Sequence, residues 1–180
     1  MLDATEAFRP GSRQAIRAGI PAASLEALDG SASSSWLEWE HDRWLMDRTM
    51  AVLGQKDAIA CWRAGVGLLI ERPLFRSVAQ PALRLFLGRP GQMVGLLPRA
   101  WGLAYRDFCT PSFRRLGPGA AELHFDEVAP QAFEAEGYLH CWHAICLAIF
   151  DLEKTPGARV RFEIDRSRAR AVASFAWDVR

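Results

Sequence analysis

The arrangement of apolar and polar residues differs between the two halves of the chain. In the first half, apolar side chains recur every three or four positions, which predicts amphipathic helices. The clearest of these starts after Ser35 as its N-cap and ends at Gly54. Further helices are predicted over residues 22–28, 57–69, 73–88 and 93–105, with Pro81 and Pro98 expected to bend or divide the last two.

The second half changes to alternation with a period of two. Residues 121–126 alternate Ala, Leu and Phe with Glu, His and Asp, and residues 159–165 alternate Val, Phe and Ile with Arg, Glu and Asp. This pattern predicts strands with one buried and one wet face. Two hairpins are expected, residues 108–116 with 120–128 around Gly117-Pro118-Gly119, and residues 159–165 with 170–179.

A helix predicted over residues 130–153 separates the two hairpins. From Tyr138 to Phe150 its only strongly polar side chains are His140 and His143, so it is expected to be buried on every side. The order of elements predicts an α+β fold, with an N-terminal helical layer on a four-stranded antiparallel sheet and this helix as the central buried element. We expect residues 1–35 to form an N-terminal arm and residues 36–180 a single ligand-binding-like domain.

Composition narrows the classes of protein. Half of the 180 residues are apolar and the net charge is +1, which is typical of a globular protein and favours neither an acidic nor a basic partner. The Arg-rich stretch near the end shares its strand face with Glu163 and Asp165, so no nucleic acid is expected. No segment reaches the roughly 18 apolar residues of a spanning helix and no signal peptide is visible, so we expect a cytoplasmic location without membrane insertion.

Candidate chemistry is concentrated in the central helix. His140, His143 and Cys146 are spaced by three residues, so their side chains form one slanting stripe. Imidazole and thiolate can bind zinc or iron, but a neutral histidine in an apolar helix is more often a core or pocket residue. The four cysteines, Cys61, Cys109, Cys141 and Cys146, include no CxxC pair and are expected to be reduced. We therefore predict no metal, no cofactor and no catalytic residue.

The order of helices, hairpin, buried helix and hairpin resembles a small-ligand-binding fold. That fold is shared by vinyl-reductase-like domains, haem-based nitric oxide sensors and a vesicle-tethering subunit family. In finer detail, residues 36–179 resemble an uncharacterised paralogous family from myxobacteria. The residues that carry this resemblance are Leu53-Gly54, Gly65 with Pro73, Gly88 with Pro90, Pro98 with Trp101, Gly117-Pro118-Gly119, Gly137 and Phe175-Ala176-Trp177. The Tyr-x-Ser-x-Arg string with which the haem sensors hold the propionates does not occur, so haem is not expected.

The resulting functional prediction is a non-catalytic cytoplasmic sensory or adaptor module. It is expected to bind a small apolar ligand beside the central helix and to signal through contact with a protein partner or a second copy. Trp101, Tyr105, His140 and His143 are predicted to lie nearest to the ligand. The alternative is a pure interaction or dimerisation scaffold with a fully packed core. An enzyme ranks third, because no nucleophile, base and orienting group occur together.

Overall fold

The structure is a computed structural model that describes residues 2–30, 38–71, 89–104 and 108–179. The chain divides into two compact units, Met1–Gly65 with Ala135–Ala144 and Val66–Glu134 with Ile145–Arg180. Two helices, α5 and α8, pass from one unit into the other. The predicted helix over residues 73–88 lies outside the described residues.

The first unit is helical. Its elements are α1 (Leu2–Thr5), α2 (Ser12–Ala18), α3 (Ala22–Gly30), α4 (Trp39–Leu53) and the first part of α5 (Gln55–Glu71), together with the first part of α8 (Glu136–Glu153). Helix α3 confirms the short helix predicted near residue 22. The N-cap of α4 is Glu38 and not Ser35, which lies outside the described residues. Gly54 ends α4 as predicted, with a φ of 79° that favours glycine.

Helices α2, α3 and α4 share a small apolar core. Ile16, Ile20 and Leu45 are buried at its centre, and Leu25 and Leu28 pack against them. On α4, the guanidinium group of Arg43 lies over the rings of Trp39 and Trp44, at 5.2 and 5.4 Å from their centroids. Residues 12–30 are therefore anchored to α4 by packing and not only by chain connection.

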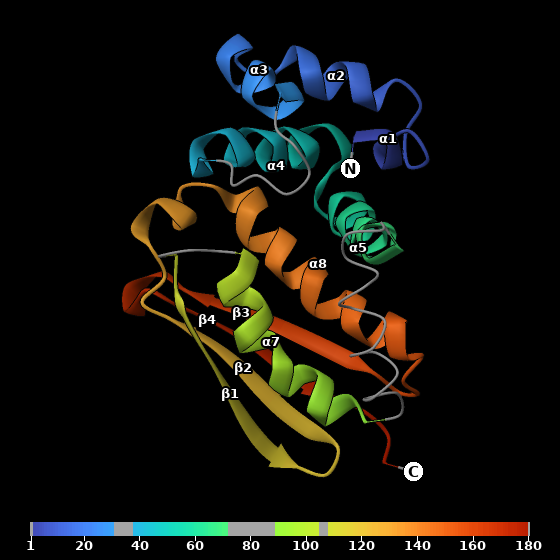
Figure 1. The fold of residues 1–180 in the computed structure, drawn as a ribbon, viewed down its shortest axis with the longest axis vertical. Helices are drawn as coiled ribbons and strands as arrows, with labels where there is room; N and C mark the ends of the chain where they lie inside the picture. The colour runs from blue at the N-terminus through green and yellow to red at the C-terminus, as the bar shows by residue number, and fades with distance from the viewer. Residues whose placement is uncertain (1, 31–37, 72–88, 105–107, 180) are drawn as a thin grey trace. The chain divides into compact units, whose positions relative to one another are not determined.

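The second unit contains an antiparallel sheet. Its strands β1 (Thr110–Gly117), β2 (Ala120–Asp126), β3 (Arg159–Asp165) and β4 (Arg170–Ala176) are arranged in the order β1-β2-β4-β3. Helix α7 (Pro90–Ala104) contacts β1 and β2 on one face of the sheet, which we call the inner face (Figure 1). The α+β class, the antiparallel sheet and the two hairpins are thus confirmed. Helix α7 continues through Pro98, where a bend or a fresh start was predicted.

The central helix begins later than predicted. Residues Pro130–Phe133 form a separate 3-10 turn, η1, and α8 starts at Glu136. A second turn of this kind, η2 (Arg166–Arg168), joins β3 to β4, and β4 ends at Ala176 where the hairpin was expected to continue to Val179. The sequence pattern missed the break between η1 and α8 and the end of β4 at Ala176, because apolar residues continue across both of these boundaries. None of the described helices is long and apolar enough to cross a bilayer.

Candidate functional site

Helix α8 has a half-buried stripe along its length. His140, His143 and Leu147 follow each other at spacings of three and four, and each is only partly covered. The same side continues to exposed Glu136 and Asp151 at the two ends of the helix. The expectation that this helix is buried on every side is therefore wrong. The physical reason is that an apolar composition fixes which residues tolerate burial but does not supply a neighbour for every face.

Most of the other side chains of α8 are buried, although Ile145 on the opposite side is half-buried. The covered side chains of its first part include Tyr138, Leu139, Trp142 and Ala144. Here Gly137 allows close contact with α4, because a Cβ at this position would lie 2.7 Å from the carbonyl oxygen of Met46. The Gly137 N–H donates to Oδ1 of Asp47 at 3.1 Å. Burial raises the pKa of Asp47, and this hydrogen bond partly opposes the rise.

His140 is the most informative side chain of the stripe. Its Nδ1 is buried and has no hydrogen-bond partner among the described residues. Burial lowers the pKa of His140, and the nearby Glu136 carboxylate opposes this only in part. Burial therefore favours the neutral imidazole, in which one nitrogen accepts a hydrogen bond and the other donates one. Buried polar atoms usually have a partner, so this nitrogen is available to bond a water or a ligand.

The cysteines are unsuited to nucleophilic chemistry. Burial raises the pKa of Cys61, Cys141 and Cys146, so all three remain protonated thiols at neutral pH. The charge of Asp42 on α4 raises the pKa of Cys141 further. Among the residues that the structure describes, no group of three His, Cys, Asp or Glu side chains is placed to hold a metal ion. The described part of the chain therefore shows neither an activated thiol nor a group of metal ligands.

The four residues predicted to lie nearest the ligand fall in different parts of the structure. Trp101 lies on α7 in the second unit, where it is 3% exposed and its ring centroid is 4.8 Å from that of Phe125. His140 and His143 lie on the part of α8 that belongs to the first unit. Tyr105 lies outside the described residues. Their joint contact with one ligand therefore remains a prediction.

The inner face of the sheet is apolar and has small residues at its centre. Ala121, Ala171 and Ala173 are completely buried there, between the larger Leu123, Phe125 and Phe175. The ring of Phe125 also contacts that of Phe162 on β3, with centroids 6.1 Å apart. The central strands of this face, β2 and β4, carry no side-chain hydrogen-bond donor toward the interior.

The outer face of the sheet carries a polar network that sequence reasoning did not identify. His124 on β2 lies between two partners, with Nε2 2.8 Å from the Glu122 carboxylate and Nδ1 accepting from the Arg170 guanidinium group. Arg170 also pairs with Asp126, at 3.0 Å. Both ring nitrogens of His124 therefore face polar partners from the same sheet face. The signal in the sequence was the alternation of Glu122, His124 and Asp126, interpreted there only as a wet strand face.

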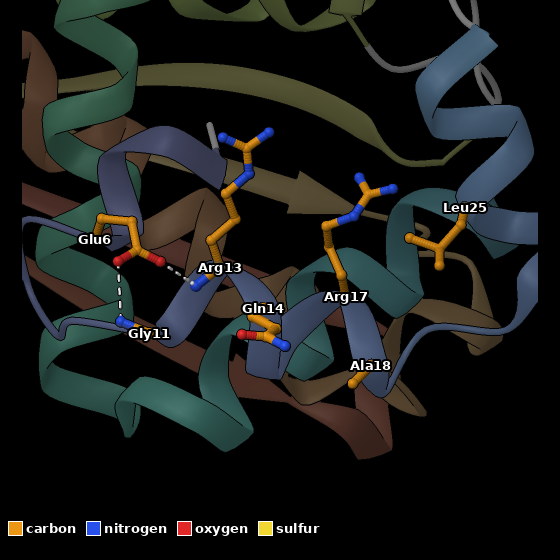
Figure 2. Close-up of a pocket in the computed structure, with 7 residues that line it drawn as sticks. All are labelled: Glu6, Gly11, Arg13, Gln14, Arg17, Ala18 and Leu25. Atoms are coloured by element: carbon orange, nitrogen blue, oxygen red, sulfur yellow. Dashed lines mark hydrogen bonds between the residues drawn. The ribbon is translucent and has the colours of Figure 1, made fainter.

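One cleft is formed by the N-terminal helices (Figure 2). It has a volume of about 640 Å³ and is open to solvent, and its lining residues are Glu6, Gly11, Arg13, Gln14, Arg17, Ala18 and Leu25. Arg17 is paired with Asp29 through two hydrogen bonds of 2.6 and 2.8 Å, and Glu6 accepts from the backbone N–H groups of Gly11 and Arg13. These charges are already satisfied within the chain, and none of the lining residues belongs to α8. The cleft is therefore not the apolar pocket predicted beside the central helix.

Comparison with solved structures identifies the fold. The Fe(II) unliganded H-NOX protein of K. algicida superposes with a TM-score of 0.64 and 11% identity, over 99% of this chain and 93% of that chain. An oxygen-binding H-NOX domain related to soluble guanylate cyclases gives a TM-score of 0.59 and 11% identity, over 98% and 90%. Neither a protein-family profile nor a curated protein sequence matches this chain. At these identities the likeness establishes an H-NOX-like fold and leaves the ligand open.

Haem does not fit the residues that the structure describes. Haem iron is held by histidine, thiolate, methionine or tyrosine, and the haem carboxylates need donors. Both nitrogens of His124 are engaged, and the pKa values of Cys141 and Cys146 are raised, so their thiols are poor ligands. His140 offers a nitrogen, but the Tyr-x-Ser-x-Arg string that, by the resemblance, would hold the haem carboxylates does not occur.

Proposed function

We propose that this protein is a non-catalytic cytoplasmic sensory or adaptor module that binds a small apolar ligand beside α8. In this proposal His140 and His143 hold the polar end of the ligand, and Trp101 and Tyr105 contact its apolar body. Ligand binding is reported through contact with a protein partner. The H-NOX-like fold supports the proposal at the level of architecture, because one of the similar proteins is described as an oxygen-binding domain.

The observation that carries the proposal is the state of His140. A neutral imidazole with a buried nitrogen that lacks a partner suits one hydrogen bond to an otherwise apolar molecule. The protonated thiols and the absence of a metal-binding cluster among the described residues give no support to catalysis.

The first test is a native mass spectrum of the purified full chain, followed by titration with the uncharged fluorescent probe N-phenyl-1-naphthylamine. We expect a small uncharged molecule to co-purify, and the probe to bind and be displaced by it. His140→Ala should weaken probe binding by about tenfold, the worth of one hydrogen bond to a buried acceptor.

His41→Ala is the matched control, because His41 already has Ser24 as a partner at 3.0 Å. This variant should bind the probe as the wild-type protein does. Near-ultraviolet circular dichroism and cooperative melting of each variant exclude probe binding to a loosened core. A wild-type protein that carries no molecule and binds no probe would overturn the proposal in favour of the scaffold with a fully packed core.

A further inference from the structure

The two edges of the sheet differ in how they are protected. Edge strand β1 contains Pro111, which has no N–H to donate, and an irregularity between Arg115 and Gly117. Both features block the addition of another strand. Edge strand β3 is a regular run of seven residues that pairs along its whole length with β4. Within the described part of the chain, its other side has no strand partner.

The apolar row of β3 is incompletely covered. Val160, Phe162 and Ile164 are each half-buried. The residues opposite them on β4, Phe175, Ala173 and Ala171, are buried almost completely. The inner layer of the sheet therefore extends to an edge that still exposes apolar surface, and an additional strand there would cover it.

The charges on the outer face of β3 are arranged symmetrically with opposite sign. Arg159 and Arg161 precede Phe162, and Glu163 and Asp165 follow it at the same distances. A two-fold axis through Phe162 would place β3 antiparallel to β3 of a second copy. Each Arg161 would then face Glu163 of the other copy, and each Arg159 would face Asp165. We propose that this edge is a homodimerisation surface through which two sheets join into one.

The register of this pairing is determined by the sequence. Only registers that keep Val160, Phe162 and Ile164 of both copies on the same face continue the apolar layer. Of these, a two-fold axis at position 161 would oppose two Arg161 side chains, and an axis at 163 would oppose two Glu163 side chains. Like charges directly opposite each other destabilise a strand pair. The axis at Phe162 gives opposite charges at every outer position, and it produces a closed, self-complementary interface.

The inner pair of charges should contribute most. Within each chain Arg161 and Glu163 already pair at 2.7 Å, with side chains 80% and 57% exposed, so dimerisation replaces two contacts within the chains by two between them. Asp165 is partly committed to the turn that follows, because its Oδ1 accepts from the Ser167 hydroxyl at 2.6 Å and from the Arg168 N–H at 3.2 Å. The Arg159–Asp165 contacts should therefore be the weaker ones.

This inference is independent of the ligand proposal, and a charge-exchange experiment tests it. Sedimentation velocity of the full chain is measured from low micromolar to submillimolar concentration at low salt. We expect a monomer–dimer equilibrium for the wild-type protein. Arg161→Glu and Glu163→Arg should each weaken dimerisation about tenfold or more, because two attractive pairs become repulsive. The double variant should dimerise again, since the exchange restores opposite charges at both positions.

Mixing the two single variants gives the sharpest result. One variant is acidic and the other basic at positions 161 and 163, so an equimolar mixture should form a heterodimer at concentrations where each variant alone is largely monomeric. Arg99→Glu, at an exposed position of α7, is the control for net charge and should behave as the wild-type protein. High salt should weaken every dimer. A monomeric wild-type protein, single variants that dimerise as tightly as the wild type, or a mixture that stays monomeric would each overturn the proposal.

Discussion

Asp42 is a carboxyl group whose ionisation opposes folding. It is half-buried on α4, and burial raises its pKa to about 6 from the ~3.9 of a free aspartate. The folded protein therefore holds this proton more tightly than the unfolded chain does. The contribution of protonated Asp42 to the free energy of unfolding is fully present below about pH 4 and is lost as the pH rises through about 6. At neutral pH the ionised and partly desolvated carboxylate lowers the free energy of unfolding.

Replacing this charge should stabilise the protein in a pH-dependent way. Asp42→Asn is expected to raise the free energy of unfolding on the order of 2 kcal/mol at pH 8, and the gain should shrink toward zero near pH 4. Urea unfolding at several pH values measures the difference. Asp57→Asn, at an exposed position of α5, is the control. Its difference in free energy of unfolding from the wild-type protein should stay constant between pH 5 and pH 8. A gain for Asp42→Asn that is independent of pH would contradict this account.

At the scale of elements, contact between α4 and α8 depends on one glycine. A Cβ at position 137 would approach the backbone of Met46 and Asp47 to 2.7 and 2.9 Å, and backbone atoms cannot move aside as a flexible side chain can. Gly137→Ala should therefore destabilise the protein by about 1–3 kcal/mol despite the better helix propensity of alanine. Thermal or chemical unfolding of the full chain measures the loss.

Gly65 provides the matched control for this prediction. It lies on α5, and a Cβ added there would meet nothing within 4 Å. Gly65→Ala should stabilise the protein by about 0.5–1 kcal/mol through propensity alone. If both substitutions stabilise, the close approach at Gly137 does not limit the packing of α8.

The elements show which features are predictable from sequence. Alternation over residues 121–126 and 159–165 located β2 and β3 to the residue or nearly so, because the two faces of a strand meet different environments. The apolar run around Trp142 predicted a central helix, but not the open stripe at His140, His143 and Leu147. Which face of a helix lacks a neighbour depends on long-range packing. The network around His124 was missed for the same reason, since Arg170 reaches it across 46 positions.

At the scale of the whole molecule, two helices link the compact units. Helix α8 belongs to one unit as far as Ala144 and to the other from Ile145, and α5 crosses between the units after Gly65. A regular helix resists bending at such a point, because every turn is closed by backbone hydrogen bonds. The two units are therefore expected to unfold together, although each has its own buried residues.

A proline at the crossing point of α8 tests this coupling. Ile145→Pro removes one helical hydrogen bond and introduces a clash with the preceding turn, at a cost of about 3 kcal/mol. In the wild-type protein, melting followed by far-ultraviolet circular dichroism and by tryptophan fluorescence should coincide in one transition. In the variant the two signals should separate, because five of the seven tryptophans lie in the first unit.

Glu136→Pro is the control for this prediction. The first position of a helix accepts proline, so this variant should retain a single transition. Coincident, unshifted transitions for Ile145→Pro would show that the continuity of α8 does not couple the two units.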